Sequence, residues 1–349
     1  MPERRNVILA MSGLLPDLPG LGPVARWLGD RRALPAGEWD VWRGRFLDGG
    51  RVVDTGNGRV SHTEGQGYGL LLALAADDTA AFDAILAWTD RHLPVRPDGL
   101  LSWRWDPARP DDPVSDPNAA IDGDLLIAWA LIRAGQHWSR PELTERGLVA
   151  ARAVRSAGVV RHGGMQLLLP GPEGFIQPEG PVINLSYWVF PALRALMDAD
   201  PHPAWAQLVI SGHRLLTSLR FGQRQLPPDW TLLAEPPRPA PGFPPVFGYN
   251  ALRIPLYAAW SEPGAIDLVR PIFSIWQRAG SEPPAVIPLD PTSPFEVGVT
   301  PGIRAILALL RHLKDGSAPD FPSIQNEPDY YAATLVLLTR LAFDEVSRS

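Results

Sequence analysis

The chain has 349 residues, of which 45% are hydrophobic and 20% are charged, and its formal net charge is −6. Such a composition describes a globular protein with ample apolar material for a core. The acidic balance, without any Lys/Arg-rich block, argues against nucleic acid as a partner. Because there is no cysteine, disulfides, thiol catalysis and thiolate metal sites are excluded. The seven histidines lack the spacing of a metal motif, so we expect neither a metal nor a cofactor.

The first twenty residues carry features of an export signal. Arg4 and Arg5 precede an apolar run from Val7 to Leu15, so a basic segment is followed by a short hydrophobic one. A first helix that packs on the body of the protein is the alternative interpretation of residues 1–20. No run of 18 apolar residues occurs anywhere, so we expect no integral membrane segment. The sequence thus predicts a periplasmic or secreted protein in which residues 21–349 form one domain.

Most of the chain carries the helical spacing of apolar residues at i, i+3, i+4 and i+7. Clusters of proline and glycine separate the helical segments. Strand-like alternation is confined to short pieces such as Gly164 to Leu169, which is typical of a loop hairpin. The predicted helices span Gly65 to Ala76, Ala80 to His92, Ala119 to Ala134, Arg140 to Ala157, Leu185 to Met197, His202 to Leu219, Tyr249 to Trp260, Ala265 to Ala279, Pro301 to Leu313 and Tyr330 to Asp344.

These helical segments, without a clear linker, indicate a single all-α domain. A closed ring of helix pairs is the natural arrangement for one domain of this kind. Two further counts are unusual, namely 39 prolines and 13 tryptophans. The prolines predict long, stiffened loops. The tryptophans offer flat faces for sugar rings, although most of them are expected in the core.

A glycine-rich motif, Ser61-His-Thr-Glu64-Gly-Gln-Gly-Tyr68-Gly, opens the first of these helices. One interpretation is a capping box, in which Ser61 caps the helix and Glu64 reaches back to it. That interpretation leaves three glycines in the first turns unexplained, and each costs about 1 kcal/mol relative to alanine. We therefore expect the backbone here to approach a substrate or another helix closely.

A second motif, Asp122-Gly-Asp124-Leu-Leu-Ile-Ala-Trp-Ala-Leu, opens a later helix. Two aspartates at a helix start are often only N-terminal caps. The chemical alternative is that an ionised carboxylate here stabilises the positive charge that develops on a sugar ring.

Together the two motifs resemble the landmarks of glycoside hydrolase family 8, and more closely its bacterial endo-β-1,4-glucanases associated with cellulose synthesis. The similarity runs from about Trp39 to Leu341, nearly the whole chain. It implies an inverting hydrolase on an (α/α)6 barrel, with six inner and six outer helices and proline-rich loops that form a substrate cleft. The further matches are Ser102-Trp-Arg-Trp105, Asn184-Leu-Ser-Tyr187-Trp188, Pro228-Asp229-Trp230, Phe247-Gly-Tyr-Asn250-Ala-Leu-Arg253-Ile-Pro-Leu-Tyr257 and Tyr330-Tyr331.

The resemblance also implies roles for particular residues. Glu64 is expected to be the general acid, and Asp122 is expected to be the carboxylate at the subsite where the sugar ring is distorted. Residues of the other motifs are expected to line the cleft and bind substrate, namely Trp103, Trp105, Tyr187, Trp188, Trp230, Tyr249 and Arg253.

The sequence departs from the family pattern at Asn250, where many members carry an aspartate as the general base. An amide cannot take a proton from water at neutral pH. Three explanations stay open. The base lies elsewhere, with Glu235 in the preceding loop as the first candidate and Asp229 as the second. Alternatively, Asn250 only positions the water while Asp122 or another carboxylate accepts the proton, or the protein binds glucan without cutting it efficiently.

The resemblance therefore predicts a monomeric, cofactor-free enzyme that cleaves β-1,4-glucan chains internally with inversion. The expected partners are a β-glucan polysaccharide and a cellulose synthase export assembly. Within the enzyme class, the alternative substrates are chitosan, xylan and mixed-linkage glucan. The alternative outside that class is a catalytically impaired glucan-binding component of a polymer-export system.

Overall fold

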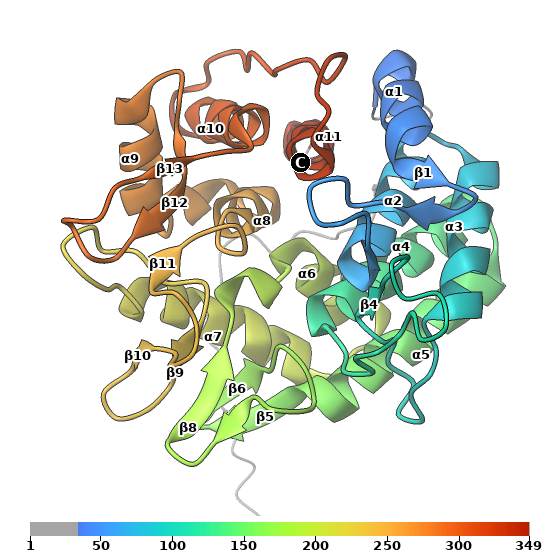
Figure 1. Ribbon diagram of the computed structural model, residues 1–349, viewed down its shortest axis with the longest axis horizontal. Coiled ribbons are helices and arrows are strands. Elements are labelled where there is room, and N and C mark those ends of the chain that lie inside the picture. The colour runs from blue at the N-terminus through green and yellow to red at the C-terminus, as the bar shows by residue number, and fades with distance from the viewer. Residues whose placement is uncertain (1–33, 349) are drawn as a thin grey trace, which may run out of the picture.

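The computed structural model describes residues 34–348, so residues 1–20, with their predicted signal or first helix, lie outside the described range. Residues 34–348 form eleven α-helices (Figure 1). No helix among them is long and apolar enough to cross a membrane. The helices are α1 (Ala36–Phe46), α2 (Thr63–Ala75), α3 (Thr79–His92), α4 (Ile121–His137), α5 (Pro141–Gly158), α6 (Phe190–Ala199), α7 (Pro203–Ser218), α8 (Arg253–Ser261), α9 (Arg270–Ala279), α10 (Thr300–Asp315) and α11 (Tyr330–Val346).

All ten helices predicted from the apolar spacing are present, but three of them, α6, α8 and α9, begin four or five residues later than predicted. The predicted first turn of α6 is the 3₁₀ helix η1 (Leu185–Tyr187), and that of α9 is largely the 3₁₀ helix η2 (Pro263–Asp267). In both α6 and α9 a proline occupies one of the first two helical positions, where a backbone N–H would have no partner within the helix. Helix α1 was not predicted, because only three of its eleven residues are buried.

The helices divide into a buried central set and a more exposed peripheral set. Helices α2, α4, α6, α8 and α11 contact one another in succession, α11 returns to α2, and α10 packs against α8 and α11. Helices α1, α3, α5, α7 and α9 lie toward the outside (Figure 1). Helix α2 buries 12 of its 13 residues, whereas α5 buries 5 of its 18. A helix that is apolar all round must be surrounded by other elements, so α2 belongs to the core.

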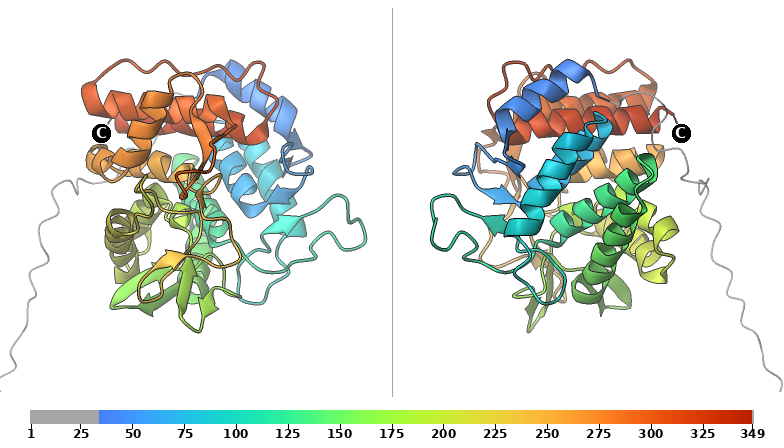
Figure 2. Two further views of the ribbon diagram at one scale, coloured as in Figure 1. Left: turned by 60° about the vertical axis from the view of Figure 1, so that its left-hand side comes forward. Right: turned by 90° about the vertical axis from the view of Figure 1, so that its right-hand side faces the viewer.

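Short strands lie in the connections between the helices (Figure 2). The β5–β6 pair confirms the hairpin predicted at Gly164 to Leu169. A four-stranded antiparallel sheet has the order β10-β9-β8-β7, and a three-stranded sheet has the order β11-β12-β13. The strands are β1 (Leu47–Asp48), β2 (Arg51–Val52), β3 (Ser61–His62), β4 (Arg104–Trp105), β5 (Val159–His162), β6 (Met165–Leu168), β7 (Ile176–Gln177), β8 (Gly180–Ile183), β9 (Thr231–Leu232), β10 (Arg238–Pro239), β11 (Val246–Phe247), β12 (Pro284–Pro288) and β13 (Glu296–Val297).

Glycines bring the N-terminal halves of α2 and α4 into direct contact. A Cβ added at Gly67 would lie 2.6 Å from Cβ of Leu126, so α4 leaves no room for a side chain there. A Cβ added at Gly123 would lie 2.1 Å from Oγ1 of Thr63 and 2.7 Å from the backbone nitrogen of Glu64. The close approach expected from the glycine-rich motif is therefore confirmed, and the neighbour is another helix.

Candidate active site

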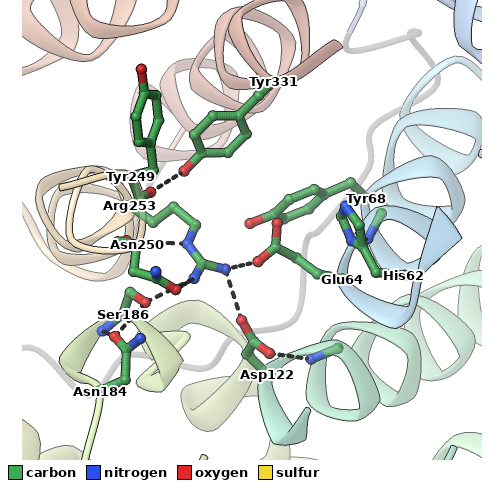
Figure 3. Close-up of polar contacts among 12 residues, drawn as sticks. His62, Glu64, Tyr68, Asp122, Asn184, Ser186, Tyr249, Asn250, Arg253 and Tyr331 are labelled. Carbon is green, nitrogen blue, oxygen red and sulfur yellow. Dashed lines mark hydrogen bonds and ion pairs between the residues drawn. The ribbon is translucent and has the colours of Figure 1, made fainter. Parts of the chain in front are cut away.

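The guanidinium of Arg253, at the start of α8, joins four polar side chains from four parts of the chain (Figure 3). Its Nη1 donates to Oδ2 of Asp122 at 2.7 Å and also to Oε2 of Glu64. Its Nη2 donates to Oγ of Ser186 at 2.9 Å and to Oδ1 of Asn250 at 3.2 Å. The side chains of Arg253 and Asp122 are 3% and 1% exposed, whereas that of Glu64 is 19% exposed. Of the two carboxylates, only that of Glu64 is therefore accessible to solvent.

Both carboxylates stand at the second residue of a helix. Glu64 is the second residue of α2 and Asp122 is the second residue of α4. Because Gly123 lets the two helix starts touch, the carboxylates face the same guanidinium. The positive ends of the two helix dipoles also point toward these carboxylates.

The capping box predicted at Ser61 is wrong. Ser61 lies in β3 paired with Trp105, and its Oγ donates to the backbone oxygen of Val52 at 2.5 Å. The N-cap of α2 is His62, whose Nδ1 accepts from the backbone nitrogen of Gly65 at 2.9 Å. Since Nδ1 is an acceptor, the proton of the neutral ring is on Nε2, which faces Oδ2 of Asp54 at 3.3 Å. The cap thus holds the first turn of α2 and leaves Glu64 free to point into the site.

The two carboxyls of the Asp122-Gly-Asp124 motif have different surroundings. Burial raises the pKa of Asp122 to about 7, Arg253 opposes this shift, and Glu64 adds to it. Asp124 is also buried, and burial holds its pKa well above the usual range. Its Oδ1 accepts from the backbone nitrogen of Leu101 at 3.0 Å, which ties the loop before β4 to α4. Asp122 therefore belongs to the site, whereas Asp124 anchors the loop before β4 on α4.

Several tyrosine side chains lie next to the Arg253 cluster. The hydroxyls of Tyr68 and Tyr257 are 2.6 Å apart, and both side chains are buried. The hydroxyl of Tyr331 donates to the backbone oxygen of Tyr249 at 2.8 Å (Figure 3). Ser186, Tyr68, Tyr257 and Tyr331 were not expected as site residues, although all four lie within matched motifs. Their position within those motifs was the available signal.

The residues discussed as general base lie in different surroundings. Asn250 precedes α8 and contacts Arg253 through both its side-chain oxygen and its backbone oxygen. Asp229 is buried, and its Oδ1 accepts from the backbone nitrogens of Gly248 and Ala251, both at 2.9 Å. Burial raises its pKa, while these amides, Arg253 and a hydrogen bond from Asn250 lower it. Glu235 is exposed in the loop between β9 and β10.

The tryptophans expected in the cleft separate into buried and half-buried residues. Trp188 is fully buried, and its Nε1 donates to the backbone oxygen of Leu208, so its ring belongs to the core. Trp103 is half-buried, and its Nε1 donates to Oδ2 of Asp116 at 2.7 Å. Trp105 is half-buried and packs edge-on against Trp88.

The remaining predicted binding residues lie beside the Arg253 cluster or near it. Tyr187 is almost fully buried, with Cζ of Arg253 5.9 Å from the centre of its ring. Tyr249 is 41% exposed, and its hydroxyl donates to Oε1 of Glu296 at 3.3 Å. Trp230 is half-buried, with its ring centre 6.2 Å from that of Tyr187.

Comparison with known proteins gives consistent matches along the chain. The family model described as glycosyl hydrolases family 8 matches residues 23–342. A probable endoglucanase of Novacetimonas hansenii is 37% identical over 312 residues, which cover 88% of this chain and 90% of that protein. The solved structure of endo-beta-1,4-glucanase CMCax from Acetobacter xylinum is 37% identical with a TM-score of 0.82 and covers 89% of this chain and 98% of that one.

A second solved structure agrees with the first. It is a GH8 endo-beta-1,4-glucanase from an Achatina fulica gut metagenomic library, with 38% identity and a TM-score of 0.80. The match covers 90% of this chain and 99% of that one. The carboxylates of both motifs contact one arginine, and the family model matches most of this chain. The chain therefore belongs to glycoside hydrolase family 8.

Proposed function

We propose that this protein is an endo-β-1,4-glucanase that hydrolyses cellulose-like chains with inversion. The observation that carries the proposal is the pairing of Glu64 and Asp122 at one guanidinium, with Glu64 on the open side. The relatives named endoglucanases support the same activity. Chitosan, xylan and mixed-linkage glucan are not favoured, because the relatives described above, which are 37–38% identical, bear the names of endoglucanases and endo-β-1,4-glucanases.

We propose that the domain of residues 21–349 is an (α/α)6 barrel. Helices α2, α4, α6, α8, α10 and α11 would form the inner layer, and α1, α3, α5, α7 and α9 would form five of the six outer positions. The segment 316–329, which has no α-helix, would take the sixth outer position. The N-terminal ends of α2 and α4 and the start of α8 then lie at the loop-rich end, where a polysaccharide can enter.

In the proposed reaction, a carboxylic acid at Glu64 donates its proton to the glycosidic oxygen while the bond to the anomeric carbon breaks. Asp122 stabilises the positive charge that develops on the sugar ring. A water molecule attacks the anomeric carbon from the opposite face and gives a proton to the base. Arg253 orients the two carboxylates, because its fork-shaped guanidinium donates to both of them.

We propose that Asn250 positions the attacking water and that Asp229 accepts its proton. Asn250 is held by Arg253, and it contacts the Asp229 carboxylate on its other side. Inversion requires a carboxylate about 6.5–9.5 Å from the acid, with room for the water between them. Glu235 remains the alternative base, and it is exposed in the loop between β9 and β10. Asp229→Asn should therefore abolish hydrolysis, whereas Glu235→Gln should leave it nearly unchanged.

We propose a periplasmic or secreted location, a monomeric state and association with a cellulose synthase export assembly. The resemblance of the motifs to bacterial endo-β-1,4-glucanases associated with cellulose synthesis supports the location and the association. Fractionation of cells that produce the full chain, followed by size-exclusion chromatography, would test the location and the monomeric state.

The decisive experiment on the activity compares wild type with Glu64→Gln. We expect wild type to shorten soluble cellulose chains internally and to release products of inverted configuration, which NMR detects directly. Glu64→Gln should lower the rate by several orders of magnitude, because Gln cannot donate a proton, yet it should keep the affinity for cellohexaose. If wild type and Glu64→Gln bind equally well and neither cuts, the protein is a glucan-binding component and the enzyme proposal fails.

A further inference from the structure

Three aromatic rings form a stack beside the four-stranded sheet. The ring centres of Phe175 and Trp230 are 5.7 Å apart with an angle of 8° between the planes. Those of Trp230 and Phe243 are 4.6 Å apart with an angle of 20°. Both phenylalanine rings thus stack on the ring of Trp230, which leaves it less free surface for a sugar. The outermost ring is that of Phe243, which is 38% exposed.

This stack is connected to the candidate active site by close ring contacts. Trp230 lies 6.2 Å from Tyr187, measured between ring centres. Tyr187 in turn lies beside Arg253, whose Cζ is 5.9 Å from its ring centre. A continuous line of side chains therefore leads from the guanidinium that holds Glu64 and Asp122 to the exposed ring of Phe243.

The loop that carries Phe243 is held in place before any ligand arrives. The backbone nitrogen of Ala240 donates to the backbone oxygen of Trp230 at 2.9 Å. Gly242 has a φ of 84°, which glycine adopts without strain, and it turns the chain just before Phe243. Four prolines surround this turn and restrict φ, namely Pro239, Pro241, Pro244 and Pro245. A ring presented by such a loop loses little conformational entropy when it binds a partner.

We propose that Phe243 is a sugar-stacking platform at the outer end of the substrate cleft. One face of its ring lies on Trp230, and the other is left to contact the flat apolar face of a glucosyl ring several units from the scissile bond. Trp230 is the support beneath the platform, and it also packs against the small apolar cluster of the sheet. The inference rests on the proposed glucan activity and assigns the length of chain that the cleft recognises.

The test measures binding in the Glu64→Gln background, so that hydrolysis does not interfere. Isothermal titration with cellohexaose and cellotriose compares Glu64→Gln with Glu64→Gln/Phe243→Ala. We expect the second substitution to weaken cellohexaose binding about three- to tenfold, which is the size of one aromatic contact. Cellotriose affinity should stay the same. Phe243→Trp in the same background should keep the cellohexaose affinity, because it preserves the aromatic face.

A matched control is Phe295→Ala in the same background. Phe295 is 49% exposed and lies against Arg224, outside the stack, so neither affinity should change. An unchanged ratio of the two affinities in Phe243→Ala would overturn the proposal. Tighter cellohexaose binding would also overturn it, because Phe243 would then occupy the place of the sugar on Trp230. The hydrolysis assay with Glu64 intact is separate, so an inactive wild type would count against the proposed activity alone.

Discussion

Asp122 and Arg253 form an ion pair of 2.7 Å between side chains that are 1% and 3% exposed. Removing one member of such a pair is costly, because it leaves the other charge buried without a partner. Glu64 contacts the same guanidinium from the side that solvent reaches. One arginine thus holds a wholly buried carboxyl and an accessible one, so the two carboxyls lie in different environments.

The pH dependence of stability should report on Asp122. Burial raises its pKa to about 7, whereas an unfolded aspartate has a pKa of about 3.9. Between about pH 4 and pH 7 the folded state therefore binds more protons at this residue than the unfolded state, and stability falls as pH rises. The slope from one such group is at most about 1.4 kcal/mol per pH unit.

Asp122→Asn should remove this contribution. In urea titrations at pH 5 and pH 7, the variant should lose less of its free energy of unfolding between the two conditions than wild type does. The amide oxygen of Asn can still accept from Arg253, so the variant is expected to fold. Identical losses in the two proteins would contradict a raised pKa at Asp122.

Arg253→Met should destabilise the protein by about 3 kcal/mol or more, because it leaves two neighbouring carboxyls without their cation. Two carboxyls that share a site resist ionising together. The loss in free energy of unfolding should therefore be larger at pH 8 than at pH 5. Arg253→Lys keeps the charge but lacks the fork that reaches both carboxylates and Ser186, so its loss should be smaller and less dependent on pH. Equal losses at the two pH values for Arg253→Met would contradict this account.

The approximate positions of most helices, and four residues of the Arg253 cluster, could be predicted from the sequence. Glu64, Asp122, Asn250 and Arg253 all stand at or just before helix starts that motifs mark. The spacing of apolar residues marks a helix wherever one face is buried, which holds for nearly every helix here. Exact helix starts could not be predicted. The turn before α8, for example, is held by Asp229, which lies more than twenty residues earlier in the chain.

Which aromatic side chains are fully buried and which are half-buried could not be predicted, because burial depends on packing between distant segments. Trp103 and Trp188 both lie in matched motifs, yet one is half-buried near the surface and the other is fully enclosed. Tyr68 and Tyr257 meet although 189 positions separate them. Spacing along the chain carries no information on such contacts, so only the three-dimensional structure shows which aromatic side chains are buried.

Gly123→Ala should lower both stability and activity. Its new Cβ would overlap Oγ1 and Cβ of Thr63, at 2.1 and 2.5 Å, and would push the start of α4 away from α2. Overpacking of this kind costs about 1–3 kcal/mol. Because the displacement also separates Asp122 from Glu64, kcat should fall more than the stability loss alone explains.

Gly44→Ala is the matched control for Gly123→Ala. Gly44 lies in α1 with no atom within 4 Å of an added Cβ, so alanine should raise stability by up to about 1 kcal/mol. Thermal unfolding and initial rates on soluble cellulose check both variants. Equal effects of the two substitutions would show that the contact between the starts of α2 and α4 does not position the carboxylates.

Asn250→Asp should raise the rate of hydrolysis. Asn250 already accepts from Arg253 through Oδ1, so an aspartate of the same shape fits the position and adds a proton acceptor. Positioned acid–base groups contribute about 10²–10⁴-fold to a rate. The gain here should stay at the low end of that range or below it, because Asp229 lies close and its negative charge opposes ionisation of a new carboxyl.

A double variant separates the roles of positions 229 and 250. If Asp229 accepts the proton in wild type, Asp229→Asn should be nearly inactive, and adding Asn250→Asp should restore hydrolysis by supplying a base directly. The measurement is kcat on cellohexaose for wild type, both single variants and the double variant, with far-UV circular dichroism to check folding. Activity of Asp229→Asn close to that of wild type would exclude Asp229 as the base. Loss of activity in Asn250→Asp would mean that the amide itself is required, because only the amide can donate a hydrogen bond to the attacking water from that position.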